Sequence, residues 1–364
     1  MKKTSMILMS SMCGAAGGFG TYFLFDYFHL EMSWSTLLWM VFYVLAGHYL
    51  TVLFHEAGHL AGGAAAGMNF HSMLVGPVLL IKERDKTALK WEKHGLSIGG
   101  KATMYADIQE KKVSIEKQLY WHILSGPLAS LLAGTAALAL SFATTQVWLF
   151  IFSMLSLLAG ITNLVIGETQ DAIPDGAALK NLKNPQLKEI FIAAYVIFGN
   201  VKNNWNELPS AIAEKARRAV LEKPDNLMSV SVASSIGQYD MSRGAQEEAV
   251  TLLGFFTERS PAVKRGYSWD QLDANYLLAC YMAGAITDKE DIHRIADRVK
   301  KRDMLSYEKA QFVLAAAKGD EKQADEALRR AIDCTSKFSL IYGDGELERT
   351  LLQMVDRLKV SSIA

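Results

Sequence analysis

The chain of 364 residues is poor in several features that support common functions. Its three cysteines, Cys13, Cys280 and Cys334, are too far apart in sequence for a CxxC metal site or a disulfide framework. Lys plus Arg and Asp plus Glu number 38 each, so the chain has no net positive charge to attract nucleic acid. We therefore expect neither a nucleic-acid partner nor structural disulfides.

Charged residues are also missing from long stretches of the first half. Four apolar runs there each approach the roughly 20 residues that a membrane-spanning helix needs. They are, approximately, Ser5–Phe25, Trp34–Phe54, Leu119–Ala143 and Val147–Ile166. The start of the chain could be mistaken for a secretory signal, but it is a poor one because no convincing cleavage site of small residues follows it, so we expect the first run to be retained as a span.

The basic residues between the runs predict the orientation. The connection from about Gly62 to Gln118 carries nine Lys or Arg residues, whereas the other two connections carry none. Basic connections stay in the cytoplasm, so four spans put both termini there. We expect an α-helical polytopic membrane domain over residues 1–185 and a cytoplasmic all-α domain over residues 186–364.

The sequence His55-Glu56-Ala57-Gly58-His59 lies at the end of the second run. Residues i and i+4 share one face of a helix, so His55 and His59 can reach the same metal ion, with Glu56 beside it. Two neutral imidazoles suit Zn2+, and the carboxylate suits a base that takes a proton from water. A structural cluster is the alternative, but ionisable groups at membrane depth are costly and by default functional.

A tetrahedral zinc site needs a third protein ligand. In the predicted topology the second and fourth spans both run toward the cytoplasm, so Asp175 can reach the depth of the two histidines. Glu168 and Asp171 are its competitors, although both suit a solvated loop. Asp175 could also form only a turn between Pro174 and Gly176. His48, two turns before the motif, is better explained as a packed core residue than as a ligand.

The order of these motifs resembles the site-2 protease family of intramembrane zinc metalloproteases. The resemblance covers about residues 34–185 and rests on HEAGH, on Gly126-Pro127, and on Asn163 followed by Asp175-Gly176. It implies a zinc endopeptidase, with Asn163 and Ser130 near the substrate. Ser130 stands where the family usually has Asn, Ile166 stands where Pro is common, and the Asn163-to-Asp175 spacing is longer than in the compact form of the motif. Some bacterial relatives look comparably spaced, and we expect a bacterial cell membrane.

The basic connection contains two short apolar stretches, Met73–Ile81 and Leu96–Met104, which read as strands bounded by glycines. They are similar to the membrane-associated β-hairpin of the same family. The resemblance implies that this hairpin, with Gly99 and Gly100 at its turn, pairs with an extended substrate.

Amphipathic helical patterns follow from about residue 200. Tyr307–Ala317 and Glu321–Asp333, joined through Gly319, resemble one tetratricopeptide-like helical hairpin, but no regular 34-residue period is present. Such a domain can hold a protein partner or a substrate tail, and a stabilising or self-associating module is equally compatible.

The sequence thus predicts an intramembrane zinc endopeptidase. His55, His59 and Asp175 would hold Zn2+, Glu56 would act as general base, and the substrate would be a transmembrane or signal-peptide-like segment. The alternatives are a non-proteolytic membrane scaffold or regulator and a peptide export factor.

Overall fold

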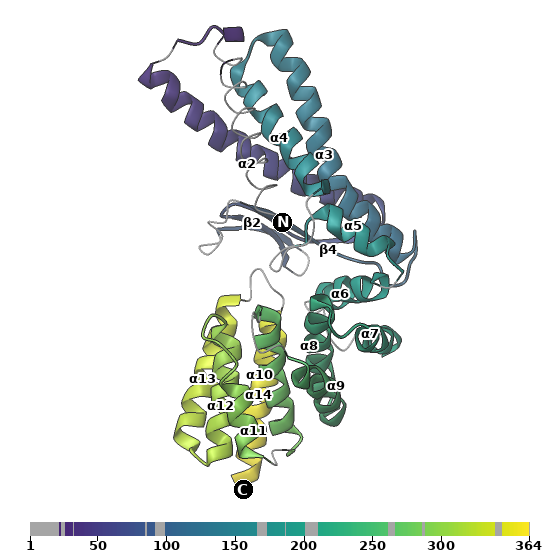
Figure 1. Cartoon of the computed structure of the whole chain (residues 1–364), viewed down its shortest axis with the longest axis vertical. Helices are drawn as coiled ribbons and strands as arrows, with labels where there is room; N and C mark the ends of the chain where they lie inside the picture. The colour runs from purple at the N-terminus through teal and green to yellow at the C-terminus, as the bar shows by residue number, and fades with distance from the viewer. Residues whose placement is uncertain are drawn as a thin grey trace, which may run out of the picture.

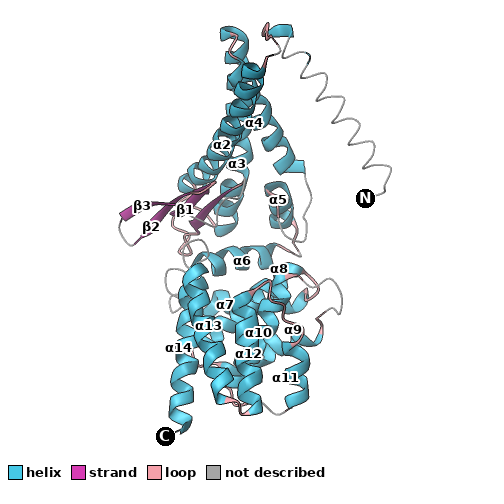
Figure 2. Ribbon diagram, turned by 90° about the vertical axis from the view of Figure 1, so that its left-hand side faces the viewer, coloured by secondary structure: helices cyan, strands magenta, loops and turns pink. Residues whose placement is uncertain are grey.

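The computed structural model describes residues 22, 26–31, 33–83, 86–91, 99–165, 173–185, 187–200, 210–260, 266–285, 288–338 and 344–363. Long helices, a small sheet and an array of shorter helices follow one another along the chain (Figure 1). The long helices project from one side of the sheet, and the helices of the C-terminal half lie on its other side (Figure 2).

Three of the described helices are long and apolar enough to cross a membrane: α2 (Trp34–Ala65), α3 (Ile115–Thr144) and α4 (Val147–Val165). The Ser33 side chain caps α2 by accepting a hydrogen bond from the Thr36 amide. These helices confirm the second, third and fourth apolar runs as helical. The predicted first span, Ser5–Phe25, lies almost wholly outside the described residues.

Small residues let the three long helices pack closely. A Cβ atom at Gly58 of α2 would come within 2.5 Å of the Ser125 carbonyl of α3, and one at Gly160 of α4 would come within 3.0 Å of the Pro127 carbonyl. Helices that lack a hydrophobic driving force in lipid associate through such close backbone contact. The glycines therefore hold α2, α3 and α4 together as one bundle.

The sheet has four antiparallel strands in the order β3-β2-β1-β4. The strands are β1 (Asn69–Val75), β2 (Val78–Glu83), β3 (Lys86–Trp91) and β4 (Gly100–Tyr105). The prediction of one strand over Met73–Ile81 was wrong, because Gly76, with φ of +54°, and Pro77 turn the chain and split this stretch into β1 and β2. Instead of a single hairpin, β1 therefore pairs with β2 on one side and with β4 on the other.

The elements described after the sheet and the long helices are all helices. They are α5 (Asp175–Lys183), α6 (Lys188–Asn200), α7 (Ser210–Glu222), α8 (Leu227–Ser242), α9 (Gln246–Glu258), α10 (Tyr267–Met282), α11 (Lys289–Ala296), α12 (Met304–Lys318), α13 (Glu321–Phe338) and α14 (Asp344–Ile363). Helices α12 and α13 confirm the predicted helical hairpin, with Gly319 at φ of +78° ending α12. Only glycine adopts this left-handed conformation without strain.

One hydrophobic core runs from the sheet into the helical array. It begins with Met104 and Leu119, continues through Leu182 of α5 and Phe191 of α6, and extends to Leu352 of α14. The core thus connects the end of the bundle of long apolar helices to the C-terminal helices. The boundary between residues 185 and 186 stays a prediction.

A buried polar network lies inside the helical array. Lys309 of α12 and Glu348 of α14 form an ion pair although both side chains are almost fully buried. Lys309 also donates to the Asn275 side chain at 2.8 Å, and Gln238 of α8 donates to Glu348 at 2.5 Å. Because each charge has partners, the network joins α8, α10, α12 and α14.

Candidate metal centre

Three side chains from two helices converge where α2 meets α5. His55 and His59 are one turn apart on α2, and Asp175 is the first residue of α5. Asp175 Oδ2 lies 3.0 Å from His55 Nε2 and 3.6 Å from His59 Nε2, and the two Nε2 atoms are 3.2 Å apart. These residues form a group that can hold a metal ion.

The spacing of the three atoms fits a tetrahedral zinc site. Zinc bonds of about 2.0–2.2 Å to nitrogen and oxygen place two ligand atoms of a tetrahedron roughly 3.3 Å apart. The observed separations of 3.0, 3.2 and 3.6 Å bracket this value. A set of two imidazoles and one carboxylate leaves the fourth position open, as in catalytic zinc sites.

Asp175 reaches the histidines because α5 begins with it. Pro174 stands at the N-cap with extended backbone, and α5 packs against both α3 and α4. Burial raises the pKa of the Asp175 carboxyl, but hydrogen bonds with His55 and His59 outweigh this effect and bring the pKa to about 2. Asp175 is therefore ionised at neutral pH, as a metal ligand must be.

Helix α3 contacts the Nδ1 atom of both imidazoles and thereby orients the rings. The Ser130 hydroxyl, fully buried, lies 3.0 Å from His55 Nδ1, and the His122 carbonyl accepts a hydrogen bond from His59 Nδ1 at 2.7 Å. In each histidine the bond at Nδ1 leaves Nε2 to face Asp175. Partners of this kind set the tautomer and the ring orientation of metal-binding histidines.

His122 was not expected at the site. Its ring is not in the ligand group, but its own Nδ1 lies 3.0 Å from the His59 carbonyl, so the two residues are linked in both directions. The sequence did contain a signal, since His122 precedes Gly126 by one helical turn on α3.

Gly126 makes room for the His59 ring. A Cβ atom there would lie 2.3 Å from His59 Nε2, which is closer than any side-chain atom can come. The glycine of the Gly-Pro pair noted in the sequence therefore helps to form the site, because it lets α3 pass close to the His59 ring.

Glu56 lies between the histidines and the sheet. It is buried, and the backbone amide of Ala102 in β4 donates a hydrogen bond to it. A Cβ atom at Gly100 would lie 2.7 Å from Glu56 Oε1, so β4 runs directly past the carboxylate. In the described part of the sheet, β4 is an outer strand that pairs with β1 alone, so its other edge has no described strand beside it.

The other residues singled out in the sequence are not part of the ligand group. Gly99 is exposed, and its carbonyl accepts a hydrogen bond from the Gly76 amide at 3.3 Å. Asn163 is half-buried in the last turn of α4 and has no contact with the ligand group among the described interactions. Glu168, Asp171 and Ile166 lie outside the described residues.

The comparison with known families agrees with this geometry. The sequence profile of peptidase family M50 matches residues 43–260, a range that includes the HEAGH motif, the sheet and Asp175. No curated protein and no solved structure matches the chain.

Proposed function

Because the chain belongs to peptidase family M50, whose members are intramembrane zinc metalloproteases, we propose that it is a zinc endopeptidase that cuts membrane-spanning or membrane-inserted peptides near the cytoplasmic face. One observation carries the proposal. His55, His59 and Asp175 converge beside a buried carboxylate, at the end of an apolar helix long enough to cross a membrane. A non-proteolytic scaffold or an export factor would not require this arrangement.

The ligand group would bind Zn2+, which when bound makes an attacking water more acidic and polarises the carbonyl of the scissile bond. Glu56 is the general base. Its carboxylate takes a proton from the attacking water and delivers it to the leaving amide nitrogen. The Ala102 amide holds the carboxylate in place, and Ser130 keeps the His55 ring in the orientation that metal binding requires.

The edge of β4 that has no described neighbour favours the proposal that the substrate binds in an extended conformation. A transmembrane helix hides its carbonyls in its own hydrogen bonds, so it must unwind before cleavage. An unwound segment can add to β4 as a further strand, which would hold it beside Glu56. Gly99 and Gly100 would leave space for the substrate backbone at the start of this edge, and Asn163 is proposed to contact the substrate from α4.

The protein is proposed to be a multi-pass protein of a bacterial cell membrane with both termini in the cytoplasm. The one-sided distribution of Lys and Arg supports this orientation. Substrates would be transmembrane or signal-peptide-like segments. The C-terminal helices would bind a protein partner or a second copy of the chain.

The Glu56→Gln variant tests the function. It keeps the size of the side chain but removes its basicity, so cleavage should slow by roughly two to four orders of magnitude while zinc stays bound. Quantitative proteomics of membranes from cells with wild-type or variant protein should reveal a membrane protein that is shortened only in the wild type. The uncut form should co-purify with the variant.

Two results would overturn the protease assignment. One is cleavage at the wild-type rate by Glu56→Gln. The other is a membrane proteome in which no protein changes length between the two strains, although both enzymes are present and contain zinc. The hypothesis of a scaffold or an export factor would then replace the protease assignment.

A further inference from the structure

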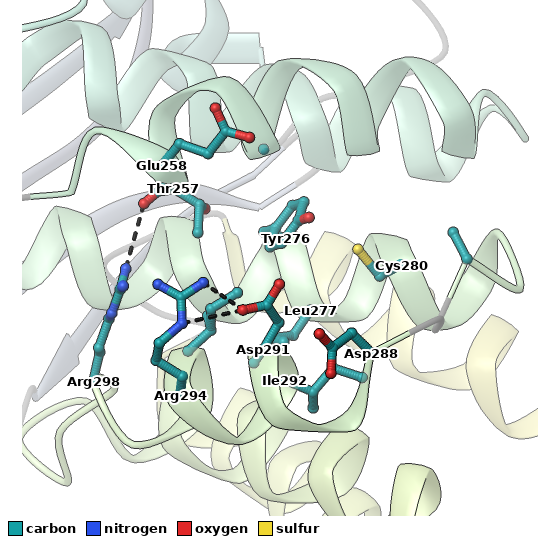
Figure 3. A pocket seen from close by; sticks show the side chains of 13 residues that line it. Thr257, Glu258, Tyr276, Leu277, Cys280, Asp288, Asp291, Ile292, Arg294 and Arg298 are labelled. Atoms are coloured by element: carbon teal, nitrogen blue, oxygen red, sulfur yellow. Dashed lines mark hydrogen bonds and ion pairs between the residues drawn. The ribbon is translucent and has the colours of Figure 1, made fainter.

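A second pocket lies in the helical array, away from the metal centre. Its cavity of about 280 Å³ is bounded by α9, α10 and α11 (Figure 3). This volume is just below the range of about 300–1,000 Å³ that is typical of pockets for drug-sized ligands, so it suits a smaller molecule. Most of the lining lies beyond residue 260, where the match to the peptidase family ends.

The pocket carries charges of both signs. Glu258, Asp288 and Asp291 contribute carboxylates, and Arg294 and Arg298 contribute guanidinium groups. In Figure 3 both arginines lie toward one end of the pocket and Asp288 lies toward the other, with Asp291 between them. Glu258 lies beside Thr257 in the same view, so the wall carries charges of both signs rather than of one sign.

Only part of this charge is neutralised within the pocket. Asp291 accepts two hydrogen bonds from Arg294, at 2.6 and 3.2 Å, so this pair is satisfied. Among the described interactions Glu258 forms no ion pair. In the part of the chain that the structure describes, Arg298 bonds the Thr257 carbonyl, at 3.4 Å, and no carboxylate. Two exposed carboxylates, Glu258 and Asp288, and one guanidinium, Arg298, thus have no ion-pair partner among the described residues and remain for a ligand.

A buried hydroxyl beside Arg298 also lacks a partner. Thr257 lines the pocket and is 4% exposed, yet its Oγ1 atom makes no hydrogen bond with any described residue. Leaving a buried hydroxyl unpaired costs about 1–3 kcal/mol, so native sites seldom keep one without a use. The Oγ1 atom itself is closed to solvent, so a rotation of the Thr257 side chain would bring the hydroxyl to a ligand that faces Arg298 and would satisfy both groups.

An aromatic side chain forms the wall between the two ends. Tyr276 lies on the pocket, and its ring packs against Gly254, where an added Cβ atom would come within 3.1 Å of it. The ring offers an apolar surface between polar ends. This arrangement suits a small organic molecule better than a metal ion.

We propose that this pocket binds a small zwitterion that carries an ammonium group and a carboxylate, namely a free amino acid or a dipeptide. The ligand carboxylate meets Arg298 and the Thr257 hydroxyl. The ligand ammonium meets Glu258 and Asp288, whose side chain also caps α11 by accepting from the Glu290 amide at 2.8 Å. The site is separate from the proposed peptidase chemistry and does not depend on it.

Isothermal titration calorimetry on the full-length chain in detergent tests the proposal. Pools of the common amino acids and of dipeptides are titrated separately, which distinguishes the two sources, and the binding pool is then resolved into single compounds. Carboxamide and N-acetyl forms of the best compound each remove one charge. We expect stoichiometric binding of at least one zwitterion, and loss of about tenfold or more in affinity for either blocked form.

Variants then place the ligand in the pocket. Arg298→Gln and Glu258→Gln should each weaken binding by about tenfold or more, and Thr257→Val should weaken it by a smaller factor. The matched controls Arg329→Gln and Glu290→Gln change exposed residues outside the pocket and should leave binding unchanged. Circular dichroism checks that each variant is folded.

Three results would overturn the proposal. The first is that no amino acid or dipeptide binds the wild-type chain at millimolar concentration. The second is that the blocked forms bind as tightly as the zwitterion. The third is that folded pocket variants bind as well as the two controls.

Discussion

The Ser130 hydroxyl lies 3.0 Å from His55 Nδ1, on the opposite side of the imidazole from Asp175, whose Oδ2 atom lies 3.0 Å from Nε2. His55 is therefore held at both nitrogens. The family resemblance implied a substrate contact for Ser130, but its hydroxyl is fully buried behind a ligand. The role that these contacts support is to position His55.

Ser130→Ala should lower zinc affinity by roughly 10- to 100-fold, because such partners of metal ligands contribute this much. Competition with a chromogenic chelator measures the affinity. Ser153→Ala is the matched control, since Ser153 is also fully buried but, among the described hydrogen bonds, its hydroxyl donates to the Phe150 carbonyl of its own helix alone. Equal zinc affinity in the two variants would show that Ser130 does not position the ligand.

Zinc content should be about one ion per chain in purified protein, because two histidines and one aspartate make a three-ligand site. His59→Ala and Asp175→Ala should both empty it. Inductively coupled plasma mass spectrometry on detergent-purified protein gives the stoichiometry. If Asp175→Ala kept its zinc at full affinity, Asp175 would not be the third ligand and Glu168 or Asp171 would take its place.

Gly126→Ala should displace the His59 ring, since the new methyl group would lie 2.3 Å from Nε2. We expect loss of zinc and of activity in a chain that still inserts into the membrane. Gly134→Ala is the control, because its methyl group would press on Leu157 of α4, where no ligand lies. It should lower the thermal stability but keep the zinc. Zinc retained at full affinity in Gly126→Ala would contradict the close packing of α3 against His59.

Cysteine labelling tests the topology. Lys90→Cys and Ser362→Cys should both be protected from a membrane-impermeant reagent in intact cells and react after the cells are opened, because the basic connection is expected in the cytoplasm. Reaction of the cysteine at position 90 from outside would reverse the orientation. The metal centre would then open toward the other face of the membrane.

The buried ion pair of the helical array predicts a stability effect. Lys309→Met would leave Glu348 buried without its cation, which costs about 3–5 kcal/mol. Denaturant unfolding of the full chain, followed by tryptophan fluorescence, should show a lower midpoint for the C-terminal helices. Lys322→Met, at an exposed position, should leave the midpoint unchanged. Equal midpoints for the two variants would mean that the pair adds nothing to stability.

Much of the fold could be predicted because it depends on local patterns. A run without charge predicts a long helix wherever it occurs, and the spacing of His55 and His59 predicts a shared face from helical geometry alone. The sheet was predicted less well. Gly76 and Pro77 lie inside an apolar stretch, and their turn becomes clear only when β1 is seen to pair with both neighbours.

The sequence by itself determined the apolar helices, the two histidines with their neighbouring base, and Asp175 as one of several possible third ligands. Only the tertiary structure decided which groups form hydrogen bonds with the two histidine ligands. Ser130 is separated from His55 by 75 residues, and His122 from His59 by 63. No local pattern encodes such contacts, because they depend on how closely α3 approaches α2, and that distance is set by glycines on both helices.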